Sequence, residues 1–264
     1  MMGWAHYGAA IELEGFDANE YLKGLDNPIV LDVGCGMSYA TGNYVSTDGG
    51  LIPLDIRYVD PLANIFNDIK KRHNRKLPDI EFGMMEYLTA FYPGHYVSLV
   101  IIQNALDHSA SPVKGIMEAL DVLENGGVLY LNHHINEAEM EHYKGFHQYN
   151  ICEEQGRLIV WNRQSKRDIS EMLEPCATVQ AFTKANHVIA VVRKKADIPE
   201  DFLSDKEDKR ELCRMVMRLA EERQNPLLAI RNMAVYWWFN AIQCLAQAMP
   251  WHIKMKVKHL IHQA

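Results

Sequence analysis

The stretch VLDVGCGMSYATG, from Val30 to Gly42, decides the fold of this chain. It continues a short apolar run, PIVLDV (28–33), which is typical of a buried strand. Asp32 ends the run, and Gly34 and Gly36 follow at once. Glycine adopts backbone angles that other residues avoid, and it lets a ligand approach the main chain closely. The stretch therefore predicts a buried strand that ends in a sharp, ligand-facing turn.

Strands and helices alternate along the rest of the chain. Further strands are expected at 51–60, 79–83, 96–103 and 127–133, a two-stranded hairpin at 178–194, and helices at 61–73 and 111–124. Ser111 and Pro112 suit the start of the second helix, and LENGG (123–127) is expected to end it through a left-handed glycine. The alternation predicts an α/β fold: a Rossmann-like, mostly parallel seven-stranded sheet with helices on both faces.

The chain divides into three parts by pattern. Residues 1–27 form an N-terminal cap segment, residues 28–195 the main domain, and residues 196–264 a helical C-terminal extension. An insertion is expected near 135–163, with GRLIVWNR (156–163) as one strand of a hairpin and a helix after it at 165–173. In the extension, apolar residues recur at helical spacing over 227–248, which predicts an amphipathic helix. It could pack on the domain, form a homodimer or touch a membrane surface.

Composition narrows the choice of partners and compartment. The 264 residues carry a net charge of -7, which argues against a nucleic-acid partner because phosphate contacts need clustered Lys and Arg. The five cysteines are scattered, as expected for a reducing compartment. The chain shows neither a secretory leader pattern nor an apolar run of about 18 residues. A cytoplasmic protein that acts on a small-molecule substrate is expected.

Polar residues follow the predicted strands at the carboxyl ends, where parallel sheets bind ligands. They fall at 32–36, Asp60, 103–108 and 132–134. Asp60 ends its strand, so its two oxygens can accept hydrogen bonds from both hydroxyls of a ribose; Asp55 is the alternative. Tyr39 stands where a G-x-G-x-x-G motif has its third glycine, which disfavours a pyrophosphate ligand and thus a nicotinamide oxidoreductase.

The D-V-G-C-G turn resembles motif I of the class I S-adenosylmethionine-dependent methyltransferases, and the likeness extends over roughly residues 28–135. The resemblance implies S-adenosylmethionine as cofactor. FGMMEYL (82–88) has Met84 where the family often has an aspartate on the adenine, which leaves adenine recognition to the backbone near Met85 and to apolar packing. The cofactor-binding residues implied are Asp32, Gly34, Cys35, Gly36, Asp60, Pro61, Met84, Met85, Gln103 and Asn104.

A looser likeness concerns the methyl acceptor. VDPLA (59–63), LDHSASP (106–112) and HYKGFHQYN (142–150) are similar to stretches of bacterial methyltransferases of polysaccharide and capsule biosynthesis. This resemblance implies an oxygen of a sugar, a nucleotide-sugar or a phosphorylated precursor as the acceptor. The alternative is a non-catalytic protein that binds the cofactor as a sensor or partner subunit.

An alcohol acceptor needs a base, and histidine is the usual base near neutral pH. His108 and His133 follow two of the predicted strands, whereas Tyr143 and His147 lie on a predicted lid with Gly145 as its hinge. One of the three histidines is expected to be the base or to orient the acceptor, with Tyr143 beside it. The alternative is that these residues lie on the surface or in the core without a chemical task.

The same segment is not expected to hold a metal. His142 and His147 are five positions apart, whereas two ligands on one helix face need a spacing of four. Glu137, Glu139 and Glu141 are the carboxylates that a cation would use if one were bound.

Overall fold

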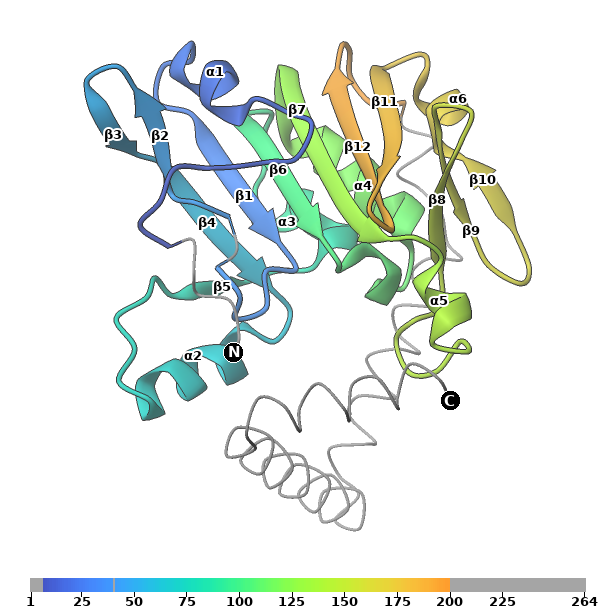
Figure 1. Ribbon diagram of the computed structural model, residues 1–264, viewed down its shortest axis with the longest axis horizontal. Helices are drawn as coiled ribbons and strands as arrows, with labels where there is room; N and C mark the ends of the chain where they lie inside the picture. Colours follow the sequence, from blue (N-terminus) through green and yellow to red (C-terminus); the bar gives the residue numbers. More distant parts are fainter. Residues whose placement is uncertain (1–6, 40, 200–264) are drawn as a thin grey trace, which may run out of the picture. The chain divides into compact units, whose positions relative to one another are not determined.

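The computed structural model describes residues 7–39 and 41–199 (Figure 1). From residue 200 on, the predicted C-terminal extension lies outside the described residues, and so does the amphipathic helix expected at 227–248.

The described residues form a main sheet of seven strands in the order β11-β12-β7-β6-β1-β4-β5. The strands are β1 (Ile29–Val33), β4 (Asp55–Asp60), β5 (Ile80–Phe82), β6 (Val97–Gln103), β7 (Leu123–His134), β11 (Ala177–Lys184) and β12 (His187–Lys194). β1 pairs in parallel with both β4 and β6, so the strand order reverses there. β12 is antiparallel to both of its neighbours, β7 and β11. The predicted Rossmann-like, mostly parallel sheet is confirmed.

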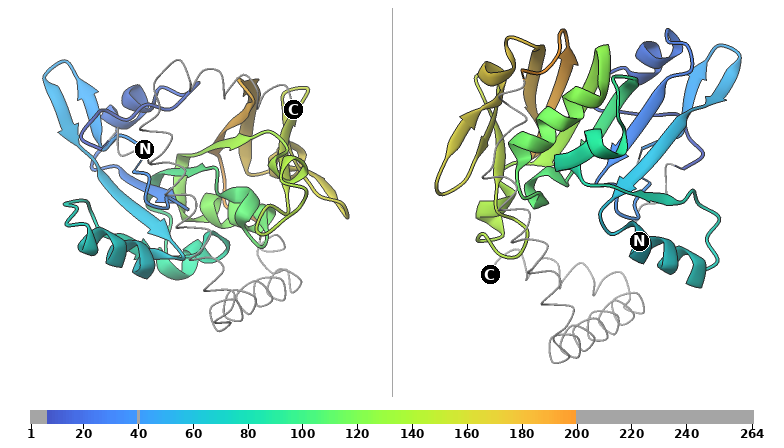
Figure 2. Two further views of the ribbon diagram at one scale, coloured as in Figure 1. Left: turned by 60° about the horizontal axis from the view of Figure 1, so that its bottom comes forward. Right: turned by 180° about the vertical axis from the view of Figure 1, so that it is seen from behind.

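Helices cover both faces of this sheet, as predicted (Figure 2). The short 3-10 turn η1 (Met85–Tyr87), α3 (Leu88–Phe91) and α4 (Pro112–Val122) pack on one face, and α1 (Ala18–Lys23) and α2 (Ala63–Arg72) on the other. Because successive side chains of a strand point to opposite faces, the sheet has one hydrophobic core on each face. In β7, Leu129 and Leu131 pack with Ile116 of α4, whereas Val128 and Tyr130 pack with Leu22 of α1.

The strand expected at 51–60 is wrong as a single element. Gly50–Pro53 forms β3, which pairs with β2 (Tyr44–Thr47) in a separate two-stranded ribbon, and β4 begins only at Asp55. Pro53 has no N–H to donate, so it ends β3, and Leu54 links the two strands. Apart from residue 40, which is not described, the chain between β1 and β2 runs as a loop without a helix.

The sequence predicts the start of α4 correctly but not its end. The predicted start is confirmed: the helix begins at Pro112, and the hydroxyl of Ser111 accepts a hydrogen bond from the Lys114 N–H at 3.4 Å. The predicted glycine cap is wrong, because Leu123 is already extended and opens β7. Instead, the buried ammonium of Lys194 donates to the carbonyl of Leu123 at 2.8 Å and to that of Asp121 at 3.3 Å. These bonds satisfy carbonyls that a helix end leaves without partners.

The insertion forms its own small sheet in the order β10-β9-β8. After α5 (Glu137–Met140), β8 (Asn150–Glu154) and β9 (Arg157–Trp161) make the predicted hairpin, and β10 (Lys166–Asp168) adds a third strand. The helix expected at 165–173 is therefore wrong in its first part. α6 (Ile169–Leu173) begins after Asp168, whose carboxylate caps it by accepting from the Glu171 N–H at 2.9 Å.

Candidate active site

Four polar side chains lie at or near the carboxyl ends of four neighbouring strands: Asp32 on β1, Asp60 on β4, Gln103 on β6 and Asn132 on β7. Each stands two residues after a side chain that packs on the α1 and α2 face, namely Val30, Tyr58, Ile101 and Tyr130. Because side chains alternate along a strand, all four polar groups belong to that same face. These four residues therefore form a polar rim where the sequence predicts one.

The glycine turn after β1 uses its two glycines differently. Gly34 has φ +71°, and a Cβ added there would lie 2.4 Å from the Cβ of Ala105. Gly36 has φ +55°, and a Cβ added there would meet no atom of the described residues within 4 Å. Packing therefore requires the first glycine, whereas the second borders open space of the kind that a ligand would fill.

Asp60 is held by the backbone of that turn. Its Oδ2 accepts a hydrogen bond from the Gly36 N–H at 3.0 Å, and its Oδ1 accepts from the Leu62 N–H at 2.7 Å. Burial raises the pKa of Asp60, and these two bonds oppose the rise. Each oxygen keeps further acceptor capacity, which suits a pair of ribose hydroxyls. Asp55, the alternative, lies at the opposite end of β4.

Asp32 belongs to a buried hydrogen-bonded chain. Its Oδ2 accepts from the hydroxyl of Thr41 at 3.1 Å, and that hydroxyl oxygen accepts from the Gln103 amide at 3.3 Å. Burial raises the pKa of Asp32 to about 7; the Thr41 bond lowers it, and the negative charge of Asp60 raises it further. An anion buried in this way is stabilised by a positively charged ligand. Thr41 is a site residue that sequence reasoning missed.

The other predicted cofactor residues differ in their burial and contacts. Met85 is buried, with its Cε 3.7 Å from the position of a Cβ on Gly34, whereas Met84 is partly exposed and Pro61 exposed. The Cys35 thiol is buried, which raises its pKa. Asn104 is exposed in a left-handed conformation, with φ 46°, and its Oδ1 accepts from the His134 N–H at 3.2 Å.

Tyr39 explains why the third glycine of a dinucleotide motif is missing. Its ring is buried edge-on against Tyr58, with the centroids 4.7 Å apart, and its hydroxyl donates to the Pro78 carbonyl at 2.7 Å. The side chain therefore fills the space beside the turn.

A cavity of about 560 Å³ lies between the rim and the N-terminal segment. Residues 11–19 line it from one side, and Gln103, Tyr130 and Asn132 from the other. Three of the lining residues are acidic: Glu12, Glu14 and Asp17. Sequence reasoning treated this segment as a cap and missed its place at the site, although the acidic pattern ELEGFD (12–17) could have pointed to it.

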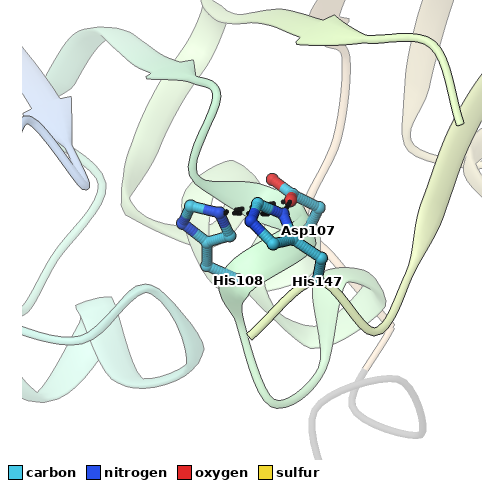
Figure 3. A group of neighbouring side chains, drawn as sticks. All are labelled: Asp107, His108 and His147. Carbon is cyan, nitrogen blue, oxygen red and sulfur yellow. Dashed lines mark hydrogen bonds and ion pairs between the residues drawn. The ribbon is translucent and has the colours of Figure 1, made fainter. Parts of the chain in front are cut away.

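A second polar group lies beyond the end of β6 (Figure 3). Asp107 and His108 belong to the 3-10 turn η2 (Leu106–His108), and His147 comes from the segment between α5 and β8. Asp107 Oδ2 lies 2.9 Å from His147 Nδ1 and 3.3 Å from His108 Nε2, and the two histidine nitrogens are 3.2 Å apart. The Asp107 side chain is 3% exposed, that of His147 26% and that of His108 44%. The carboxylate is therefore buried, whereas both imidazoles are accessible.

Buried hydrogen bonds hold the loop that carries this Asp107–His108–His147 cluster. Glu86 accepts from the Ala110 N–H at 2.7 Å, and the Tyr149 hydroxyl donates to the Ala110 carbonyl at 3.1 Å. Asp107 is the member that sequence reasoning missed. Its position beside His108 in LDHSASP was a signal, but the partner residue lies 40 positions further along the chain.

His133 and Tyr143 take other places than predicted. His133 is 1% exposed on the α4 face of β7, and burial lowers its pKa to about 4, so it lacks the access that a base acting on an acceptor needs. The hydroxyl of Tyr143 accepts from the Asn150 amide at 2.9 Å, and the Arg163 guanidinium lies 4.1 Å from its ring centroid. Of the predicted catalytic residues, the structure brings together His108 and His147.

Comparison with protein families agrees with this geometry. Residues 31–131 match the family model described as a methyltransferase domain. This span contains the glycine turn and three of the four rim residues, Asp32, Asp60 and Gln103, and it ends one residue before Asn132. Residues 31–131 therefore resemble a methyltransferase domain, and this match supports S-adenosylmethionine as the cofactor.

Several solved structures are similar to the chain. A putative S-adenosylmethionine-dependent methyltransferase from Listeria monocytogenes is 14% identical, with 67% of this chain and 96% of that chain covered and a TM-score of 0.41. An O-methyltransferase family protein from Burkholderia thailandensis is 11% identical, with 64% and 51% covered and a TM-score of 0.40. The carbon methyltransferase CurJ is 14% identical, with 68% and 51% covered and a TM-score of 0.46. The chain spans about half the length of the last two.

A search of curated proteins found no match. Within the described part of the chain, no helix is long and apolar enough to cross a membrane.

Proposed function

We propose that this methyltransferase transfers the methyl group to an oxygen atom of a small-molecule acceptor. The observation that carries the proposal is the Asp107–His108–His147 cluster, a pair of imidazoles on a buried carboxylate beyond the end of β6. It follows the strand that ends in Gln103, one of the four polar residues of the rim. The chain thus offers a group that activates a hydroxyl beside the site that holds the cofactor.

The cofactor site is built from Gly36, Asp60 and Asp32. Gly36 leaves room beside the main chain, Asp60 offers two acceptor oxygens for the ribose, and the Asp32 carboxylate suits a positively charged ligand. When bound, S-adenosylmethionine supplies a methyl carbon whose bond to sulfur breaks, with the electron pair left on sulfur, as the acceptor oxygen bonds to that carbon.

The cluster assists the acceptor. A neutral hydroxyl is a poor nucleophile, and its proton must leave as the new bond to carbon forms. Asp107 fixes His147 through Nδ1 at 2.9 Å, which leaves Nε2 to take up the proton, and the carboxylate stabilises the imidazolium that results. The exposed His108 would bind and orient the acceptor, and its exposure supports this role.

For the acceptor we propose an oxygen of a sugar, a nucleotide-sugar or a phosphorylated polysaccharide precursor. The likeness of VDPLA, LDHSASP and HYKGFHQYN to methyltransferases of such pathways supports this class. Two of these stretches contain His108 and His147, so the likeness falls on the residues of the cluster. A non-catalytic sensor is the second candidate, but accessible imidazoles on a buried carboxylate favour an enzyme.

The test is turnover of isotope-labelled S-adenosylmethionine by the full chain against a panel of nucleotide-sugars and phosphorylated sugars. His147→Ala should lower turnover by about 10²–10⁴-fold, the usual contribution of general acid–base catalysis. Its affinity for S-adenosylhomocysteine should stay at the wild-type value. His142→Ala, which changes an exposed histidine of the same segment, is the matched control.

Two results would count against the proposal. Wild-type turnover in both His108→Ala and His147→Ala would remove the cluster from the reaction. Binding of S-adenosylhomocysteine without a methylated product from any acceptor of the panel would favour the sensor.

A further inference from the structure

In the Asp107–His108–His147 cluster, every residue contacts both of the others. Each of its three contacts uses the same atom of each residue: Oδ2 of Asp107, Nε2 of His108 and Nδ1 of His147 (Figure 3). The three atoms form a nearly equilateral triangle with sides of 2.9, 3.2 and 3.3 Å. Three atoms with electron pairs to donate therefore converge on one point.

Hydrogen bonds alone cannot satisfy this triangle. Each ring nitrogen carries at most one proton, and the carboxylate oxygen carries none when ionised. If both nitrogens donate to Asp107, two N–H groups face each other across the 3.2 Å contact. If one nitrogen donates to the other, an unprotonated nitrogen faces the carboxylate. At least one of the three contacts remains unfavourable in either arrangement.

A bound cation satisfies all three contacts at once. Bonds of about 2.0–2.2 Å from a metal ion to nitrogen or oxygen separate neighbouring ligand atoms by about 2.8–3.6 Å in tetrahedral or octahedral geometry. All three sides of the triangle fall in that range. Two imidazoles and one carboxylate suit first-row divalent ions such as Zn²⁺. We propose that Asp107, His108 and His147 bind a divalent transition-metal ion.

The burial of Asp107 supports this site independently. Its side chain is 3% exposed, and its Oδ1 has no hydrogen-bond partner among the described residues. The same holds for both ring nitrogens of the buried His133. Burying a carboxylate is costly unless a positive charge or donors compensate. A divalent ion on Oδ2 supplies that charge, and the exposed His108 leaves its outer face open to a further ligand.

The spacing along the sequence could not show this site. Asp107 and His147 are 40 positions apart, and the fold of the insertion brings them together. A short-range spacing, such as that of His142 and His147, describes only ligands that lie on one helix.

The inference deepens the proposed function and rests on it for its chemical meaning. A cation at this position would bind the acceptor oxygen, either a hydroxyl or a phosphoryl oxygen, and would lower the pKa of a bound hydroxyl. Nδ1 of His147 would then be a ligand, and activation of the acceptor would pass from the imidazole to the ion.

The test uses Co²⁺, whose visible absorption reports its ligands, added to the full chain after dialysis against a chelator. The wild type should bind one Co²⁺ per chain by equilibrium dialysis. Asp107→Asn and His147→Ala should each weaken binding at least about 100-fold, since each removes or weakens one of three protein ligands. His142→Ala and His134→Ala, two histidines outside the triangle, should bind as the wild type does.

Binding of S-adenosylhomocysteine in the same samples shows that each variant is folded. If the wild type binds no Co²⁺, or if Asp107→Asn and His147→Ala bind it as tightly as the wild type, the metal site is wrong. Turnover in the chelator-treated, metal-free enzyme would leave the proposed function standing without the ion. If the wild type binds Co²⁺ but methylates no acceptor, the metal site stands and the proposed function does not.

Discussion

At Gly34 and Gly36, one residue type meets two different demands two positions apart. The first glycine lies against Ala105, whereas the second borders space that the described residues leave open. Both have positive φ, so any other residue would be strained at either position. The two positions therefore separate stability from ligand binding.

We expect Gly34→Ala to destabilise the fold by about 2–4 kcal/mol, because its Cβ would overlap that of Ala105 in addition to the backbone strain. Gly36→Ala should cost only about 1–2 kcal/mol of stability but should weaken S-adenosylhomocysteine binding at least about tenfold. Urea unfolding and calorimetry measure the two effects. Wild-type affinity in Gly36→Ala would contradict the assignment of that space to the cofactor.

Asp32 makes the stability of the ligand-free protein depend on pH. Its folded pKa of about 7 lies above the ordinary value of 3.8, so between these values the folded chain keeps a proton that the unfolded chain loses. The free energy of unfolding therefore falls as pH rises through this window, by about 3 kcal/mol between pH 5 and pH 8. Asp32→Asn, which cannot ionise, should lack this contribution.

The measurement is urea unfolding of the wild type and Asp32→Asn at both pH values. The stability of the variant relative to the wild type should increase toward pH 8, because other titrating groups cancel in the comparison. A difference that does not change with pH would mean that Asp32 is not held protonated by burial.

Residues that follow a strand directly could be placed from sequence, whereas contacts across the fold could not. Asp32, Gly34, Gly36 and Asp60 each come at or just after a strand end, a position that hydrophobic runs reveal. The contact of Asp107 with His147 depends on the path of the insertion. Nothing local in the sequence encodes that path.

At the scale of elements, the two ends of α4 show the same contrast between features set by neighbouring residues and features set by distant ones. The start of the helix was readable because its cap and its proline are neighbours in the chain. Its end was not, because Lys194, which bonds to the last carbonyls, lies 71 positions after Leu123. The break between β3 and β4 was missed because only Leu54 separates the two strands.

Lys194→Met should destabilise the protein by about 1–3 kcal/mol. Methionine can occupy similar space, but it leaves the carbonyls of Asp121 and Leu123 without this donor in a buried position. Lys195→Met changes the exposed neighbour, and its effect should stay within about 0.5 kcal/mol. Chemical denaturation compares the two, and equal effects would contradict a capping role for Lys194.

At the scale of the whole molecule, ligand-induced stabilisation distinguishes the two classes of nucleotide cofactor. S-adenosylhomocysteine at about 100 times its dissociation constant should add about 2.7 kcal/mol to the free energy of unfolding. NAD should add nothing comparable, because the Tyr39 ring fills the space beside the turn. A thermal-shift comparison measures both. A shift with NAD as large as that with S-adenosylhomocysteine would contradict this selectivity.

The position of β12 has a consequence for synthesis of the protein. It is the last strand of the main sheet along the described chain, yet it lies inside the sheet, between β7 and β11. A nascent polypeptide that has not reached His187 thus leaves β7 as a bare edge, with β11 unable to dock. Exposed edges of this kind invite pairing with other chains. The main sheet is therefore completed only when β12 has emerged from the ribosome. Products truncated before β12 should aggregate.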